Sequence, residues 1–294
     1  MKLCIIVNPN AGRKQGLAAA DKAADLFKSR DVDFDIKVSE KPGDSVTLAE
    51  NLDTETYTGI IAVGGDGTLF EVINGLLKSR KTISIPVGQI PVGTGNSFIK
   101  DLGISSIDQA LSVIIGGNTK NIDLGKFSSS SGSFYFANLL GTGFVSNVAY
   151  RAQKYKKLGA FSYILGVLEE VTVLKSVEVL LNIDGKEFKK DVIFTEICNS
   201  RYTGGDMLMA PDAEIDDGLL DVVILNKVSR VKLLSLFPKL FKGTHINDPA
   251  IEVLKGKIIS LKSSVPMALT PDGETFGETP VEITTYPKKI KMFC

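Results

Sequence analysis

The sequence predicts an α/β domain followed by an all-β domain. In the first part of the chain, apolar β-branched runs are each followed by a polar or glycine-rich turn and then by apolar residues at helical spacing. In the second part, short segments alternate apolar and polar residues between turns, as strands of an antiparallel sandwich do. A chain of 294 residues with 44% hydrophobic content can bury two cores. We place the domains at residues 1–122 and 123–294, and allow the last strand to return to the first domain.

Composition excludes several classes of protein. Lys and Arg together number 34, as do Asp and Glu, so a net charge of zero gives no general attraction to nucleic acid. The cysteines, Cys4, Cys198 and Cys294, are odd in number and lack zinc-site spacing, which favours a reducing compartment. The N-terminal apolar run is too short for a signal peptide, and no segment approaches the roughly 20 apolar residues of a membrane span. We expect a cytoplasmic protein that is at most peripherally attached to a membrane.

The first predicted strand, residues 2–7, leads into a polar turn and an amphipathic helix. Asn-Pro and Ala-Gly are ordinary turn formers, so one interpretation is a plain βα loop. In the other interpretation, the turn contacts nucleotide phosphate or ribose through Asn8 with its neighbour Pro9, through the Gly12 backbone and through Arg13. A second strand, residues 33–38, ends at Ser39 before another helix.

The pattern of the central stretch, residues 57–77, predicts a buried strand, a glycine turn and a helix. Glycines let the backbone adopt positive φ and let a ligand come close, and the first N–H groups of a helix attract an anion. The turn therefore predicts a phosphate cradle formed by Gly64, Gly65, Gly67 and Thr68. Asp66 lies inside it, and a carboxylate beside phosphate suggests a divalent cation or a transferring proton between them.

A third glycine turn follows a predicted strand at residues 83–92 and contains Thr94, Gly95 and Asn96. Turns after parallel strands gather at the carboxyl edge of a sheet, so we expect Asn8, Asp66 and Asn96 to converge. None of the three turns matches the GxxxxGK[ST] pattern, which excludes the usual P-loop.

In the second half, the predicted strands are residues 177–188, 190–200, 218–226 and 257–263. The acidic stretch 204–221 can bind a hard cation or can be a solvated turn. His245 is the only histidine, and we expect it in an exposed loop, which disfavours hydrolases that need a histidine base. The PDGE segment, residues 271–274, reads as a hairpin turn.

A helical segment near residues 148–174 joins a basic cluster to aromatic and aliphatic residues. This combination suits a bilayer surface, although an ordinary helix with one packed face is equally compatible with it. The cluster consists of Arg151, Lys154, Lys156 and Lys157, beside Tyr155, Phe161 and Tyr163.

The segments NPNAG, GGDGTLFEVINGL and PVGTGNSF, in this order, resemble the catalytic domain of the diacylglycerol kinase family, which includes bacterial lipid kinases, sphingosine kinases and ceramide kinases. The GGDGT turn is shared with NAD kinases and resembles the phosphofructokinase turn. The resemblance covers nearly the whole chain and implies a Rossmann-like, NAD kinase/phosphofructokinase-like first domain and a sandwich-like second domain. Many members have Asp after the Asn of the third turn, where this chain has Ser97.

The resemblance implies transfer of the γ-phosphoryl group of ATP, with Mg²⁺, to a lipid hydroxyl. Asp66 would order Mg²⁺ and phosphate, and Asp272 or Glu274 would be the base. The nucleotide site would also include Ser39 and Glu71. A structural Mg²⁺ would be held by Asp217 with the backbone carbonyls of Glu214 and Leu219.

Sphingosine kinases carry acidic residues ahead of the KYKKLG-like segment that contact a cationic amine, whereas residues 146–150 of this chain hold no carboxylate. We therefore expect a neutral lipid such as diacylglycerol, met at a membrane surface. The alternatives are a sphingoid-base kinase, a kinase for a soluble acceptor such as NAD, and a non-catalytic lipid or nucleotide sensor. For the oligomeric state, a homodimer and a monomer are both compatible with the sequence.

Overall fold

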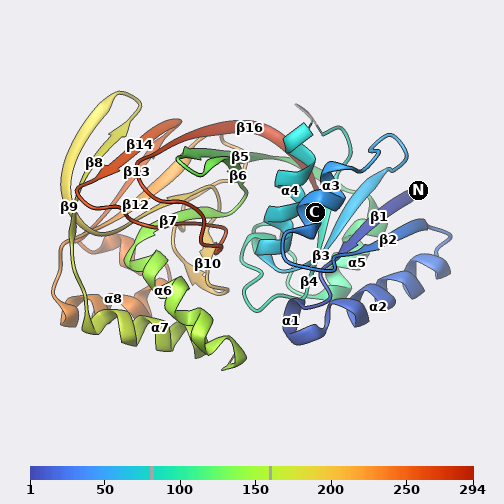
Figure 1. The fold of residues 1–294 in the computed structure, drawn as a ribbon, viewed down its shortest axis with the longest axis horizontal. Coiled ribbons are helices and arrows are strands. Elements are labelled where there is room, and N and C mark those ends of the chain that lie inside the picture. The colour runs from blue at the N-terminus through green and yellow to red at the C-terminus, as the bar shows by residue number, and fades with distance from the viewer. Residues whose placement is uncertain (80–82, 159–160) are drawn as a thin grey trace. The chain divides into compact units, whose positions relative to one another are not determined.

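The structure, a computed structural model, describes residues 1–79, 83–158 and 161–294. The chain folds into two compact units, whose elements are labelled in Figure 1. The first unit comprises Met1–Ile122 and Lys288–Cys294, and the second comprises Asp123–Pro287. The strand β16 (Val281–Phe293) begins in the second unit and ends in the first.

The first unit contains a parallel sheet in the order β4-β3-β1-β2. The end of β16 joins it beside β4, where Met292 lies opposite Val87. All six residues of β3 are buried, because helices cover both faces of a parallel sheet. The strands are β1 (Lys2–Val7), β2 (Asp33–Val38), β3 (Gly59–Gly64) and β4 (Val87–Pro91).

The strand predicted over residues 83–92 is shorter in the structure, where β4 begins only at Val87. The physical reason is Pro86, which has no N–H to donate to a neighbouring strand.

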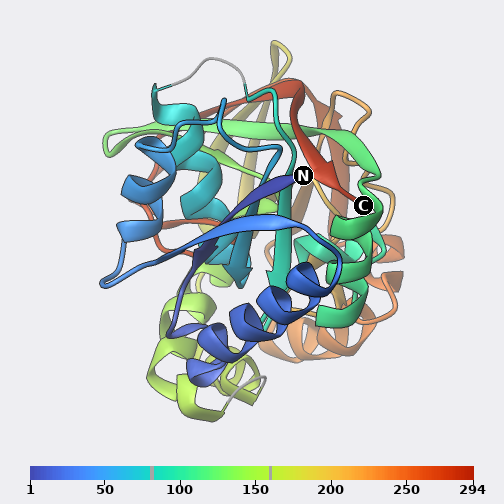
Figure 2. The ribbon, with the colours of Figure 1, turned by 90° about the vertical axis from the view of Figure 1, so that its right-hand side faces the viewer.

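Helices α2 and α5 pack on one face of this sheet, where Ala23, Phe27 and Leu111 share a core with Ile5 and Ile61. Helices α3 and α4 pack against each other, and Figure 2 shows them on the opposite side of the strands from α2 and α5. The helical elements are α1 (Ala11–Lys14), α2 (Gly16–Ser29), α3 (Asp44–Glu50), α4 (Asp66–Ser79), the 3₁₀ helix η1 (Phe98–Leu102) and α5 (Ile107–Gly116).

The second unit is rich in antiparallel strands, as the alternating pattern predicts. Its first strands are β5 (Thr119–Ser129), which begins in the first unit, β6 (Gly132–Phe136), β7 (Leu139–Gly143), β8 (Val177–Ile183), β9 (Lys186–Cys198), β10 (Tyr202–Thr203) and β11 (Met207–Leu208). The others are β12 (Leu220–Asn226), β13 (Ile251–Gly256), β14 (Ile258–Ser263) and β15 (Leu269–Pro271).

The long strand β9 organises the second unit. Its first half pairs with β8 across a turn at Asp184 and Gly185, and its second half lies between β12 and β7. Strand β7 in turn pairs with β15. The sheet therefore places the β9, β7 and β15 backbones side by side.

Three α-helices cover a face of these strands, with a core that includes Val148, Val167, Phe194, Val223 and Leu236. The helical elements are α6 (Phe144–Ala152), η2 (Gln153–Leu158), α7 (Phe161–Thr172), α8 (Arg230–Leu240) and η3 (Thr244–Asn247). The predicted helical segment 148–174 corresponds to α6, η2 and α7. Residues 159–160 and the side chains of Lys156, Lys157 and Phe161 lie outside the described part of the chain. Within the described ranges, no helix is long and apolar enough to cross a membrane.

Candidate active site

Three turns at the carboxyl edge of the first unit's sheet come together, as the parallel topology predicts. The Asn8 N–H donates to Val63 O at 3.1 Å, and the Val92 N–H donates to Gly64 O at 3.2 Å. The Asn8 side-chain amide donates to Thr68 Oγ1 at 3.3 Å. The loops after β1, β3 and β4 thus share hydrogen bonds.

The turn after β1 requires glycine at residue 12. Gly12 has φ +55°, and a Cβ there would lie 1.9 Å from Val92 O. Asn8 holds the turn through its Oδ1, which accepts the Asn10 N–H at 3.0 Å. Arg13 follows with φ 61° and an exposed side chain. An exposed guanidinium beside a tight backbone turn suits contact with phosphate.

Asp66 binds the third turn directly. Its Oδ2 accepts the Ser97 N–H at 2.9 Å, and its Oδ1 accepts the Phe98 N–H at 3.3 Å. The two glycine turns also touch, because a Cβ on Gly93 would lie 2.5 Å from Gly65 Cα. Asp66 therefore has a bracing role that sequence reasoning missed.

Asn96 uses its side chain within its own turn. Its Oδ1 accepts the Gly93 N–H at 3.0 Å and its Nδ2 donates to Gly93 O at 2.7 Å, while its backbone has φ 51°. Thr94 is exposed at the tip of this turn, and Ser39 is anchored at the end of β2 by its N–H bond to Val7 O at 2.9 Å. Glu71 is half-buried on α4.

The two carboxylates of the DGE segment have different surroundings. Asp272 is buried with φ 48°, and its carboxylate accepts the N–H groups of Ala137, Asn138 and Leu139 at 3.0, 2.9 and 3.1 Å. Glu274 is exposed, and its side chain makes no hydrogen bond or ion pair with any residue that the structure describes. The Asp272 carboxylate therefore fixes the backbone of the turn, and the Glu274 side chain extends from this turn into solvent.

The acidic turn before β12 is organised by hydrogen bonds and by a lysine. The Gly218 N–H donates to Asp123 Oδ2 at 2.6 Å, and the Leu219 N–H donates to Asp217 Oδ1 at 2.9 Å. Lys255 Nζ lies 3.6 Å from Asp217 Oδ2 and 3.3 Å from Asp221 Oδ2.

The charges in this turn influence one another. Burial raises the pKa of Asp221, and Lys255 opposes that shift. For Lys255, burial lowers the pKa, but Asp221 and Asp217 outweigh it and leave the pKa raised. An ammonium already faces the Asp217 carboxylate, while the Glu214 side chain is exposed. This arrangement is a poor fit for a divalent ion, because the lysine charge repels a second cation.

An apolar pocket of about 50 Å³ lies in the second unit between β9 and helices α6, α7 and α8. Polar groups in its lining come from Tyr163, Thr203 and His245. The remaining lining residues are Phe144, Val145, Val148, Val167, Phe194, Met207, Met209, Leu225, Leu233, Leu234, Leu236, Phe237, Leu240 and Ile251. Nothing in the local sequence pattern indicates this pocket, because it is formed by segments far apart in the chain.

His245 lines this pocket and is 1% exposed, so the expectation of an exposed loop is wrong. The reason is packing: η3 folds back so that Nε2 lies 3.0 Å from Met209 O. Burial lowers the pKa of His245, which keeps the imidazole neutral near pH 7.

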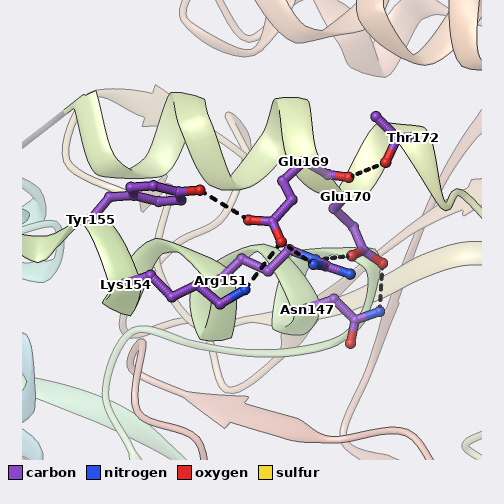
Figure 3. A network of polar contacts seen from close by, with 7 residues as sticks. All are labelled: Asn147, Arg151, Lys154, Tyr155, Glu169, Glu170 and Thr172. Carbon is purple, nitrogen blue, oxygen red and sulfur yellow. Dashed lines mark hydrogen bonds and ion pairs between the residues drawn. The ribbon is translucent and has the colours of Figure 1, made fainter.

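Arg151 and Lys154, the two members of the basic cluster whose side chains the structure describes, are paired within the molecule (Figure 3). Arg151 forms ion pairs with Glu169 and Glu170, and Lys154 Nζ lies 3.1 Å from Glu169 Oε1. Asn147 also donates to Glu170 Oε1 at 2.8 Å. The acids on α7 therefore neutralise the charges of Arg151 and Lys154, two of the four residues on which the membrane hypothesis rested.

Sequence reasoning missed Glu196 on β9. This residue is 2% exposed, and burial raises its pKa to about 8, although a hydrogen bond from Thr203 opposes the shift. The available signal is a glutamate within the mostly apolar second half of β9, residues 192–198, on the same face as Phe194 two residues earlier.

Comparison with known proteins agrees with this architecture. Residues 2–127 match the family model described as the diacylglycerol kinase catalytic domain. Residues 138–294 match the model described as the YegS C-terminal NAD kinase beta sandwich-like domain. The two family models therefore match both halves of the chain, with the catalytic domain first and the sandwich-like domain second, as the sequence predicts.

Individual relatives match over their whole length. A diacylglycerol kinase from Bacillus subtilis (strain 168) is 31% identical, with 98% of this chain and 94% of the relative covered. One from Staphylococcus aureus (strain MRSA252) is 30% identical, with 99% and 91% covered. A crystal structure of a Bacillus anthracis (strain Sterne) protein assigned to the diacylglycerol kinases is 26% identical, with a TM-score of 0.82 and 99% and 96% covered.

The fold and these matches define a phosphotransferase that acts on an alcohol acceptor, of the lipid-kinase class. The chain belongs to the diacylglycerol kinase family.

Proposed function

We propose that this protein transfers the γ-phosphoryl group of ATP to the hydroxyl group of a neutral lipid such as diacylglycerol. The observation that carries the proposal is the apolar pocket in the same unit as the exposed Glu274 carboxylate. Small-molecule sites are typically lined by apolar side chains with a few polar groups among them, as this pocket is. The relatives described above are named for the same lipid.

The first unit would bind ATP at the three converging turns. The N-terminus of α4 offers backbone N–H groups to phosphate, and Gly64, Gly65 and Gly67 allow close approach. Asn8 and Thr68 are hydrogen-bonded to each other beside this helix start, and Arg13 is exposed on the neighbouring turn. Ser39, Glu71, Thr94, Gly95, Asn96 and Pro9 complete the proposed nucleotide site.

Mg²⁺ would accompany the nucleotide and neutralise the charge of its phosphates. Asp66 fits a place beside such an ion, because a carboxylate oxygen that accepts one N–H retains acceptor capacity. Its negative charge is held in position by the Ser97 and Phe98 amides. Asp66 would thus orient the bound phosphates while it braces the turn.

Glu274 is the group that we assign as the base for the lipid hydroxyl. Asp272 has its carboxylate committed to three N–H donors, whereas Glu274 has no such partner within the described ranges. A base must be free to approach the hydroxyl and accept its proton. Asp272 would then act indirectly, by fixing the turn that carries Glu274.

The lipid chain would occupy the apolar pocket of the second unit. Helix α8, which contributes to the lining, also exposes apolar side chains, with Val231 at 78% and Leu234 at 42%. Leu234 also lines the pocket, and exposed apolar residues on a helix that lines an apolar pocket suit entry of a lipid from a bilayer surface. A soluble acceptor such as NAD would find few polar partners in this pocket.

The proposal is tested by phosphate transfer from ATP-Mg²⁺ to diacylglycerol in mixed micelles. We expect Glu274→Gln to lower kcat by about 10²- to 10⁴-fold without changing the thermal midpoint, because it removes only the proton acceptor. Glu278→Gln, an equally exposed change four residues later, is the matched control and should retain activity. Near-normal turnover of Glu274→Gln would remove this residue from the mechanism.

A further inference from the structure

Glu196 lies between the apolar pocket and the strand that carries the candidate base. Glu196 on β9 is opposite Gly141 on β7, and Gly141 is opposite Thr270 on β15. Directly opposed residues share a face of the sheet. Thr270 is followed by Pro271 and then by the turn that presents Glu274.

The Glu196 carboxyl group lies beside Gly141. A Cβ on Gly141 would lie 3.6 Å from Glu196 Oε1 and 3.1 Å from Thr270 Oγ1. Thr270 Oγ1 is bonded to Ser146 Oγ at 2.8 Å and to Gly141 O at 3.2 Å. The Glu196 carboxyl therefore reaches across β7 toward β15.

The other side of Glu196 borders the pocket. Phe194, two residues earlier on the same face of β9, lines the pocket, as does Thr203, which is hydrogen-bonded to Glu196. Tyr163 of α7 lines it too and interacts electrostatically with Glu196. A bound lipid with its chain in the pocket and its hydroxyl group near Glu274 would lie alongside the Glu196 carboxyl group.

Glu196 lies directly behind these lining residues and has an unsatisfied polar atom. Its Oε2 is buried and has no hydrogen-bond partner among the residues that the structure describes. Burial raises the pKa of Glu196 to about 8, so the group is a neutral acid with an O–H donor at pH 7. The titratable groups beside it are Tyr163 and Cys198, whose pKa values are also raised by burial, so both stay neutral over this range.

We propose that the neutral carboxyl group of Glu196 donates a hydrogen bond to an ester carbonyl of the acceptor lipid, and so selects an uncharged ester lipid. This inference rests on the proposed function. Thr203 is hydrogen-bonded to this carboxyl group, but an O–H on the buried Oε2 still requires an acceptor, and none of the described residues supplies one to that atom. The ester carbonyls of a diacylglycerol lie between its free hydroxyl and its chains, as Glu196 lies between Glu274's turn and the pocket.

The test compares an ester lipid with its ether counterpart, dioleoylglycerol against dioleylglycerol diether, in mixed micelles at pH 7. For the wild-type protein we expect a KM about threefold to tenfold higher for the diether, because an ether oxygen is the weaker acceptor. Glu196→Leu should raise KM for the ester and abolish the ester preference. Glu196→Gln keeps a donor at this position and should restore the preference.

A pH profile supplies a second readout. The wild-type KM for the ester should rise above about pH 8, where Glu196 loses its proton, and the KM of Glu196→Gln should stay flat. Glu178→Gln, an exposed glutamate on β8, is the control.

The outcomes separate the two proposals. A wild-type ester preference that survives in Glu196→Leu, with thermal melts confirming that the variant is folded, would overturn the role of Glu196 and leave the kinase assignment standing. Absence of labelled product from wild-type protein with either lipid would overturn the proposed function and this assignment with it.

Discussion

Two buried carboxyl groups of the second unit show that burial alone does not decide what an acid does. Asp272 is 6% exposed, and three backbone N–H groups compensate its desolvation. Glu196 is 2% exposed, and its Oε2 has no partner within the described part of the chain. The first residue therefore holds a backbone turn in place. The second is a neutral polar group that a ligand can satisfy.

At the residue scale, Glu196→Gln should stabilise the protein increasingly as pH rises. The carboxyl is protonated in the folded state up to about pH 8, whereas the unfolded chain releases the proton near the ordinary value of 4.5. Between these values the folded state holds one more proton, so the wild-type free energy of unfolding falls by about 1.4 kcal/mol per pH unit relative to the variant.

Thermal or urea melts from pH 5 to pH 8 measure this difference. The gap between Glu196→Gln and the wild type should widen with pH and level off above pH 8. A constant gap would show that Glu196 does not hold a proton in the folded state. The exposed change Glu178→Gln serves as the comparison.

At the scale of elements, helices α6 and α7 are joined by ion pairs that involve Arg151, a member of the basic cluster for which membrane contact was one of two interpretations. Arg151 of α6 pairs with Glu170 of α7, whose side chain is 7% exposed, and with Glu169 (Figure 3). These contacts hold two helices that form a wall of the apolar pocket. Because Arg151 and Lys154 are paired internally, we expect an apolar surface to contribute to bilayer contact.

The corresponding prediction concerns α8. Val231→Asp should lower the fraction of protein that sediments with phosphatidylcholine vesicles containing diacylglycerol, because it places a charge at the most exposed apolar position of this helix. Ile258→Asp on β14, where the wild-type side chain is 61% exposed, is the matched control and should leave sedimentation unchanged. Equal losses for both variants would argue against α8 as the contact surface.

At the scale of the whole molecule, charge is balanced inside the fold as well as in the composition. The chain has equal numbers of acidic and basic residues, and Lys255 supplies a cation at the acidic turn where the family resemblance implies Mg²⁺. The Lys255 ammonium also donates to the carbonyl oxygen of Asp212 at 3.2 Å. Lys255 thus supplies a positive charge from within the chain at the acidic turn before β12.

We therefore expect the folded protein to resist removal of divalent metal. EDTA should leave the thermal midpoint of the nucleotide-free wild type unchanged, because Lys255 already compensates Asp217 and Asp221. Lys255→Met should lower the midpoint and make it rise again on addition of Mg²⁺, since Asp221 is then buried without its partner. The exposed change Lys257→Met is the control, and a large drop of the wild-type midpoint in EDTA would contradict this account.

The sequence by itself determined the fold class, the family and the order of strands, turns and helices. These features are local: the period of apolar residues, the positions of glycines and the turn residues act over a few neighbours. The GGDGT turn accordingly falls between a fully buried strand and the start of α4. The exception, the late start of β4, is local too and comes from Pro86.

Only the tertiary structure decided what individual polar residues do, because their partners are distant in the chain. Asp66 meets the amide of a residue 31 positions away, and Asp272 meets amides more than 130 positions away. The His245 ring is hydrogen-bonded to the backbone of Met209, 36 positions earlier. The position of Glu196 beside Gly141 and Thr270 results from the pairing of β9 with β7 and of β7 with β15. The roles of the site residues stay predictions, whereas their surroundings are set by long-range contacts that no local pattern encodes.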